Sequence, residues 1–269
     1  MKPNFISWLS VWTLFLVVTS CADHRIPQAQ RFRIKTVRTT SSDPYTTYLS
    51  TTTERYNYDS NDRLVSYVSG LESNSPAPIG DSSRTVLNYD AQGRMENIFS
   101  ESRDLVNTAS GVVRLWRPSF SYLYEYDMNG NISVMKIVAI TKDRSRSPNL
   151  LEVLRFEYND AKLPVKVIHT QASDNYQWIE QYTYGGANIV KIETSDNQSA
   201  PVTTAYQYDN KPNPFYGLII GDKRNDAFTM FNRNNLIASD NQYEYDSNGL
   251  LSKVVVVGGI VQTYEYEAY

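Results

Sequence analysis

Cysteine and histidine are almost absent from this chain. Its 269 residues include one cysteine, Cys21, and two histidines, His24 and His169. A single thiol has no partner within the chain, so no intramolecular disulfide stabilises the fold. Two histidines are too few for a multi-histidine metal site or a His-based triad. His169 follows the strand-like residues 165–168, and we interpret it as a residue on the face of a strand.

The motifs of common catalytic sites are also missing. The sequence contains no Gly-x-Ser-x-Gly, no phosphate-binding loop and no Gly-rich dinucleotide fingerprint. Residues 127–131 have the first spacings of a calcium loop, but Ile132 stands where glycine is required and Val138 where a bidentate glutamate is required. A turn is the better interpretation. We therefore predict no catalytic residue, no metal site and no cofactor, and the sequence singles out no binding residue.

Neither sign of charge dominates. The 26 basic residues are spread among 29 acidic ones, for a net charge of −3. A nucleic-acid partner is therefore not expected, because such proteins carry a basic patch or stripe. The 29 acidic residues offer no way to choose a catalytic pair of carboxylates, although such a pair could be assembled from distant strands.

The N-terminal segment has the pattern of an export signal. Lys2 precedes an apolar run over residues 5–18, which is too short for a membrane-spanning helix. The run ends in small residues directly before Cys21, and this arrangement resembles a bacterial lipobox. The resemblance implies cleavage before Cys21 and lipid attachment to its thiol, which would hold the protein at a membrane. We predict a lipoprotein signal peptide over 1–20 and a flexible tether over 21–30. Ala22, in place of aspartate, resembles lipoproteins sent to the outer membrane; the membrane face stays open.

Tyrosine, in contrast, is abundant and ordered. The chain has 21 tyrosines, and many belong to a motif Tyr-x-Tyr followed by a turn residue, which returns at intervals of roughly 20 to 40 residues. A fixed pattern at such intervals is typical of one supersecondary unit used repeatedly. The motif and its near relatives occur at residues 56–59, 87–90, 124–127, 156–159, 182–185, 206–209, 243–246 and 264–266.

Each unit is predicted to be a β-hairpin. The two rings of Tyr-x-Tyr point to the same face of a strand. The following Asp-x-x-Gly, as in Asp127–Gly130, suits a tight turn in which aspartate bonds forward and glycine adopts a left-handed conformation. The return strands, such as residues 131–135, are rich in β-formers. The fold class is therefore all-β, with repeated antiparallel hairpins forming one long, twisted or curved meander sheet over residues 31–269.

The repeat resembles a known family. Residues 88–95, Asn-Tyr-Asp-Ala-Gln-Gly-Arg-Met, are similar to the YD repeats of RHS-type proteins, and the likeness covers roughly residues 50–269. Residues 208–215, Tyr-Asp-Asn-Lys-Pro-Asn-Pro-Phe, resemble a phrase of YD-like repeat lipoproteins of Bacteroidetes. That smaller family implies an envelope lipoprotein and has no established activity to carry over. Gly185 and residues 159–162 depart from the pattern and indicate drifted repeats.

The second tyrosines of the motifs are expected to form an internal ladder that holds the sheet together, because cross-strand aromatic pairs stabilise neighbouring strands. Recognition should then lie on the opposite face or on irregular loops, since loops on a rigid scaffold commonly carry function. The candidate loops are residues 142–149 and 212–240, and residues 73–83 are expected to form a further exposed loop. The expected ladder contains Tyr58, Tyr89, Tyr126, Tyr158, Tyr184, Tyr208, Tyr245 and Tyr266.

These observations favour a non-enzymatic binding or scaffold module of the bacterial cell envelope, anchored to a membrane through Cys21. An envelope protein or a glycan is the expected partner. Two alternatives stay open. One is a carbohydrate-active enzyme of the envelope, and the other is a purely structural assembly component.

Overall fold

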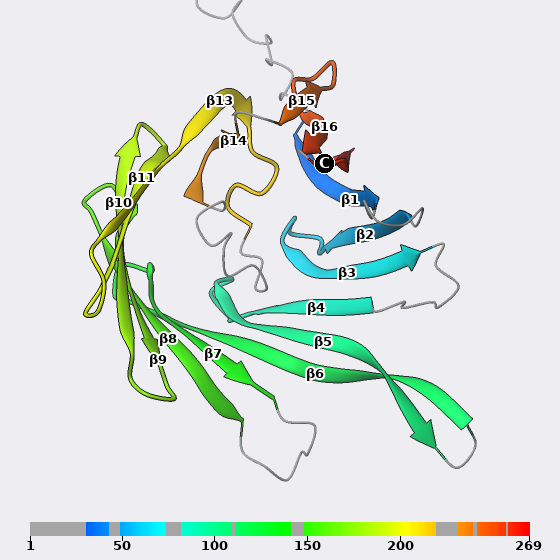
Figure 1. Cartoon of the computed structure of the whole chain (residues 1–269), viewed down its shortest axis with the longest axis horizontal. Coiled ribbons are helices and arrows are strands. Elements are labelled where there is room, and N and C mark those ends of the chain that lie inside the picture. The colour runs from blue at the N-terminus through cyan, green and yellow to red at the C-terminus, as the bar shows by residue number, and fades with distance from the viewer. Residues whose placement is uncertain are drawn as a thin grey trace, which may run out of the picture. The chain divides into compact units, whose positions relative to one another are not determined.

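The structure is a computed structural model that describes residues 31–42, 49–73, 82–108, 111–140, 148–218, 231–238, 241–256 and 258–269. Cys21, His24, the predicted signal peptide and the predicted tether lie outside these ranges. The described residues form seventeen strands (Figure 1), whose bounds are β1 (Phe32–Ser42), β2 (Leu49–Tyr58), β3 (Leu64–Ser73), β4 (Ser82–Tyr89), β5 (Met95–Thr108), β6 (Gly111–Tyr126), β7 (Ile132–Ala139), β8 (Asn149–Tyr158), β9 (Pro164–Gln171), β10 (Gln177–Gly185), β11 (Asn188–Asp196), β12 (Val202–Ala205), β13 (Gln207–Pro212), β14 (Asn234–Ile237), β15 (Gln242–Tyr245), β16 (Leu251–Val256) and β17 (Ile260–Ala268).

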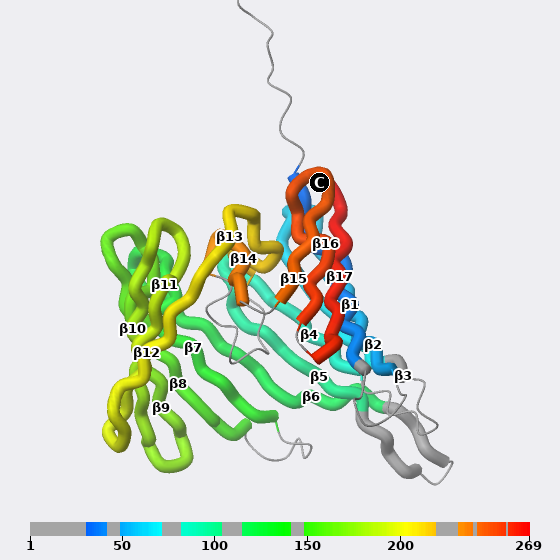
Figure 2. The backbone as a smooth tube through the Cα atoms, turned by 45° about the horizontal axis from the view of Figure 1, so that its top comes forward, coloured from blue at the N-terminus to red at the C-terminus, as the bar shows by residue number. Residues whose placement is uncertain are grey.

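The predicted all-β architecture of antiparallel hairpins is confirmed. Fifteen strands form one antiparallel sheet, and β13 and β14 form a separate two-stranded sheet. From β1 to β12 the order in the sheet follows the chain, as a meander requires. The sheet bends along this order (Figures 1 and 2). Its end strands are β12 and β15, so the sheet formed by the described residues is open.

The meander prediction needs one correction. The last hairpins do not follow β12; instead β17 pairs with β1, and β16 and β15 continue outward from it. An edge strand leaves a row of its N–H and C=O groups without strand partners. Because β17 pairs with β1, β1 is not an edge strand. The pairing joins residues more than 200 positions apart, as the 2.8 Å hydrogen bond from Arg33 Nε to Glu267 Oε1 illustrates.

The turn chemistry follows the prediction. In the third unit the Oδ1 atom of Asp127 accepts hydrogen bonds from the backbone N–H groups of Asn129 (2.9 Å) and Asn131 (2.8 Å). Gly130 has φ of +80°, the left-handed conformation that the turn needs. Asp127 therefore organises a turn rather than a calcium loop.

The drifted unit at residues 159–162 builds the same turn without glycine. Asn159 replaces aspartate and its Oδ1 accepts from the backbone N–H groups of Ala161 and Leu163, both at 3.0 Å. Lys162 takes the glycine position and keeps φ of +59°. The hydrogen bonds of the unit hold a non-glycine residue in a conformation that L-residues disfavour.

In six of the units the second tyrosine joins its unit to the preceding hairpin, whereas Tyr245 donates to the Asp209 carboxylate. In those six units the hydroxyl group donates to a backbone carbonyl at the start of the neighbouring return strand. Most of these tyrosines also sit at a register shift of the ladder, which re-aims the side chain. The bonds are Tyr58 to Ile34 (2.8 Å), Tyr89 to Leu64 (2.7 Å), Tyr126 to Met95 (2.6 Å), Tyr184 to Pro164 (2.9 Å), Tyr208 to Ile189 (2.7 Å) and Tyr266 to Leu251 (2.8 Å).

An arginine covers the same ring in the first units. The guanidinium carbon of Arg63 lies 4.5 Å from the centroid of the Tyr89 ring, and that of Arg94 lies 4.5 Å from the Tyr126 ring. Each arginine also pairs with the turn aspartate of its own unit, as Arg63 does with Asp59 at 2.7 Å. Six of the eight tyrosines of the expected ladder thus connect neighbouring hairpins through hydroxyl-to-carbonyl bonds, and cation–π contacts add to this in the first units.

The first position of each motif points into the core. Tyr56, Leu87, Tyr124 and Tyr182 are all buried there. Ser82, expected in an exposed loop, instead lies in β4 opposite Gly70. Of the loop predicted over residues 142–149, residues 142–147 fall outside the described ranges. Among the described residues, no helix is long and apolar enough to cross a membrane.

The chain divides into two compact units. Arg33–Glu267 form the large one, which contains every site discussed below. The described residues of the small one are Arg31, Phe32, Ala268 and Tyr269. Within the small unit the backbone N–H of Tyr269 donates to the carbonyl of Arg31 at 3.0 Å.

Candidate functional site

The sixth unit of the repeat carries an insertion within its turn. Asp209 bonds forward to the N–H of Lys211 at 2.9 Å, as the other turn aspartates do. Its second partner is distant in sequence: Oδ1 and Oδ2 accept from the backbone N–H and the side-chain amide of Asn235, both at 3.1 Å. Asn131 makes the same pair of bonds to Asp127 in a normal turn. Residues 210–234 are therefore inserted between the aspartate and its usual partner.

The described part of this insertion packs on the bent sheet. The side-chain carbonyl of Asn232 accepts from the backbone N–H of Ile189 at 2.6 Å, and Asn232 is only 1% exposed. Asn188 and Asn234 exchange two bonds of 2.9 and 3.0 Å. The ring of Phe215 lies 6.4 Å from those of Tyr56 and Tyr264. These contacts hold the described part of the insertion against β2, β11 and β17.

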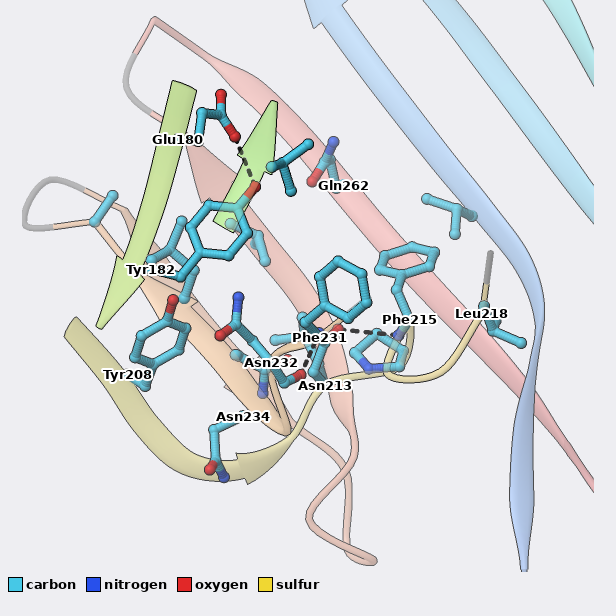
Figure 3. Close-up of a pocket in the computed structure, with 18 of the residues that line it drawn as sticks. Glu180, Tyr182, Tyr208, Asn213, Phe215, Leu218, Phe231, Asn232, Asn234 and Gln262 are labelled. Carbon is cyan, nitrogen blue, oxygen red and sulfur yellow. Dashed lines mark hydrogen bonds between the residues drawn. The ribbon is translucent and has the colours of Figure 1, made fainter. Parts of the chain in front are cut away.

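A cavity of about 620 Å³ lies between the insertion and the sheet. Strand residues such as Val37, Leu154 and Val254 form part of its wall, and Phe215, Phe231 and Asn232 of the insertion form another part. Figure 3 shows Tyr182 on β10, Tyr208 on β13, and Phe215 and Phe231 on the insertion. The volume and the many aromatic rings are typical of sites for small organic ligands.

A cluster of ionisable side chains occupies the wall formed by β8, β9 and β10. His169 Nδ1 lies 2.8 Å from Glu152 Oε1, and its Nε2 lies 3.7 Å from Glu180 Oε2. The Trp178 ring stacks on the imidazole with centroids 4.4 Å apart. The hydroxyl group of Tyr182 donates to Glu180 Oε2 at 2.6 Å. His169 Nε2 is buried and has no hydrogen-bond partner among the described residues.

The cluster favours a charged imidazole. Burial acts to lower the pKa of His169, but the carboxylates of Glu152 and Glu180 outweigh it and raise that pKa above its ordinary value. Burial likewise acts to raise the pKa of Glu180, while His169 and Tyr182 favour its charged form and lower that pKa overall. Both shifts have the same meaning: the folded protein stabilises an imidazolium between two carboxylates.

Other units repeat the contact between the first tyrosine of the motif and an acceptor side chain, which is a carboxylate in one unit and a carboxamide in another. The hydroxyl group of Tyr56 donates to Glu54 Oε2 at 2.7 Å, and Tyr264 donates to Gln262 Oε1 at 3.0 Å. Each acceptor stands two positions before the first tyrosine of its motif, so it shares the inward face. The acceptors Glu54 and Gln262 and the ring of Tyr264 line the cavity, whereas Tyr56 lies in the core.

The sequence prediction missed this cluster. His169 does lie on a strand face, as interpreted, and that face forms part of the cavity wall. The acidic residue two positions before Tyr-x-Tyr could have indicated this cluster. Side chains two positions apart lie on the same face of a strand, so this residue lies beside the inward-facing rings. Of the predicted recognition loops, residues 212–218 and 231–238 contain residues that line the cavity. Within the described ranges no group of His, Cys, Asp and Glu side chains is arranged to hold a metal ion.

Comparison with known proteins supports the fold alone. A porin-like protein from Bacteroides uniformis has a TM-score of 0.53 to this chain at 11% identity, over 88% of this chain and 96% of that one. A TcdB2–TccC3–Cdc42 complex has a TM-score of 0.32 at 16% identity, over 77% of this chain and 12% of that one. The first match shows a shared β architecture. No family model and no curated protein matches the sequence.

Proposed function

We propose that this protein is a non-enzymatic binding module of the bacterial cell envelope and that it holds its ligand in the cavity beneath the 210–234 insertion. The observation that carries the proposal is the insertion itself. A regular turn would complete the sixth unit with three residues between Asp and the return strand, as Ser247, Asn248 and Gly249 do after Asp246. The described residues of the longer segment add no strand to the main sheet and build a cavity wall.

The envelope setting is the second part of the proposal. It rests on the lipobox-like residues before Cys21, which lie outside the described ranges. The β architecture shared with a protein described as porin-like, from Bacteroides, is compatible with this setting. A lipid on Cys21, followed by the tether over 21–30, would hold the sheet next to the membrane and leave the cavity available to an envelope protein or glycan.

The test replaces residues 210–234 by Ser-Asn-Gly in the full chain, which restores a normal turn between Asp209 and Asn235. The probe is 2-phenylethanol, a neutral aromatic alcohol small enough for the cavity. Binding is followed by the indole N–H resonance of Trp178, which lines the cavity, with Trp116 as an internal reference. We assign the Trp178 signal with Trp178→Phe.

We expect the probe to shift the Trp178 signal in the natural chain and to leave it unchanged in the shortened chain. The Trp116 ring, which lies 5.3 Å from the Arg84 guanidinium carbon, is not among the residues that line the cavity, and its signal should stay constant in both. Circular dichroism of the shortened chain shows whether the sheet persists. An unchanged Trp178 signal in the folded natural chain would favour a purely structural component instead.

A carbohydrate-active enzyme is the second candidate, and the approach of Glu152 and Glu180 to one histidine favours it. Glycosidases, however, keep one carboxyl group protonated by raising its pKa. The pKa of Glu180 is shifted the other way, so Glu180 does not suit the role of the general acid. Release of reducing ends from an envelope polysaccharide by the natural chain, but not by Glu180→Gln, would favour the enzyme.

A further inference from the structure

The two faces of the sheet differ in whether basic side chains pair with their carboxylates. On the outward face, the middle glutamate of several motifs forms a cross-strand ion pair with a lysine. A lysine on the neighbouring strand thus compensates each of these acidic residues. The pairs are Glu125 with Lys136, Glu157 with Lys166 at 2.8 Å and Glu244 with Lys253 at 2.7 Å.

The cavity contains no such compensation. Its described lining includes the carboxylates of Glu54, Glu152 and Glu180 but no lysine and no arginine. Two of them accept from tyrosine hydroxyl groups, which carry no charge. His169 is the one basic side chain in the described lining, so the lining stays negative even when the imidazole is protonated.

Of the two carboxylates in the cluster, Glu180 is the more accessible to a ligand. Its side chain keeps 28% of its surface exposed, against 10% for Glu152, whose Oε1 faces His169 Nδ1. A partly buried negative charge gains more from a counter-charge than one in bulk water does. Aromatic rings also attract cations through their faces. Both effects favour a positively charged ligand and disfavour an anion.

We infer that the cavity binds a small organic cation, whose ammonium or guanidinium group pairs with Glu180 while its apolar part lies among the aromatic rings of the wall. This inference rests on the proposed function and specifies its ligand class. The cavity volume of about 620 Å³ suits an organic molecule. Figure 3 shows Glu180 and Tyr182 at one end of a space lined further on by Phe231 and Phe215.

The test compares three probes of nearly equal shape and different charge. They are 2-phenylethylamine (+1), 2-phenylethanol (0) and 3-phenylpropanoate (−1), titrated into the full chain at neutral pH with the Trp178 indole signal as readout. A charge-assisted contact predicts that the amine binds about tenfold more tightly than the alcohol. The propanoate should bind more weakly than both.

Two matched variants locate the charge. Glu180→Gln keeps an acceptor for Tyr182 and removes the negative charge, so it should reduce the affinity for the amine about tenfold and leave that for the alcohol nearly unchanged. Glu157→Gln removes a carboxylate from the outward face and should change neither. Added salt should weaken binding of the amine only.

Each outcome decides a different statement. Equal affinities for amine and alcohol would overturn the inferred ligand class and leave the binding function intact. Tighter binding of the propanoate would also overturn it. A Trp178 signal that responds to none of the probes would contradict both the ligand class and the proposed function. Loss of amine affinity in Glu157→Gln would show that a carboxylate on the outward face of the sheet contributes to binding of the amine, which would contradict the assignment to Glu180.

Discussion

At the scale of single residues, Tyr126 shows how one side chain joins two hairpins. Its hydroxyl group donates to the carbonyl of Met95 at 2.6 Å, and Arg94 covers its ring. Tyr126→Phe keeps the ring and removes the bond. We expect a loss of about 1 kcal/mol in the free energy of unfolding, the usual net value of such a bond. Denaturant titration measures it.

Tyr216 supplies the control for this prediction. It is 52% exposed and lies outside the ladder of second tyrosines. Tyr216→Phe should leave the denaturation midpoint nearly unchanged. If both variants unfolded at the same denaturant concentration, the hydroxyl-to-carbonyl ladder would not contribute to stability.

His169 gives stability a defined dependence on pH. Its pKa in the folded protein lies above the ordinary value of 6.5 because two carboxylates outweigh burial. The stabilisation is therefore fully present below pH 6.5 and is lost as the pH rises through the raised pKa. As the pH rises from 6.5 through the raised pKa, the natural chain should lose stability, and His169→Gln should lose much less.

Urea titrations across this range measure that prediction. The ring signals of the two histidines, His24 and His169, also allow a direct NMR titration. His24→Gln assigns the signal of His169. A His169 signal that titrates below pH 6.5 would contradict the placement of the imidazole between Glu152 and Glu180.

At the scale of elements, the turns differ in how well their residues suit them. Gly130 has φ of +80° with open space around it, so strain is the only penalty for a side chain there. Gly130→Val should destabilise the protein by about 1–3 kcal/mol. Lys162 has φ of +59° at the same position of its own turn.

The opposite substitution therefore has the opposite sign. Lys162→Gly relieves the left-handed strain and should stabilise the protein by about 1 kcal/mol. Denaturation midpoints of the two variants, compared with that of the natural chain, measure both effects. Shifts in the same direction would refute the common register that we assign to the two turns.

At the scale of the whole molecule, we expect membrane attachment to depend on one side chain. Because Cys21 is the only thiol and follows small residues, we expect its Sγ to carry the lipid. Cys21→Ser should leave the protein unprocessed or unanchored. Labelling with a clickable fatty acid measures this, and Ser20→Ala, which keeps the thiol, is the matched control. Equal labelling of Cys21→Ser and the natural chain would disprove the anchor.

The sequence alone determined the hairpin unit. Tyr-x-Tyr, the turn aspartate and the left-handed glycine act over a few residues, so their spacing contains the physical information for a strand, a turn and a return strand. The local rule also extends to turns that lack glycine, because the hydrogen bonds of Asn159 replace those of aspartate. For this reason the all-β class and the repeat could be predicted.

Only the tertiary structure decided where the chain closes on itself and where the cavity lies. The pairing of β17 with β1 and the bond between Asp209 and Asn235 join residues that no local spacing connects. Glu152, His169 and Glu180 lie on three different strands, and their meeting depends on the register of β8, β9 and β10. A period of two assigns each side chain to a face of its strand, but only the folded sheet determines which faces enclose a common space.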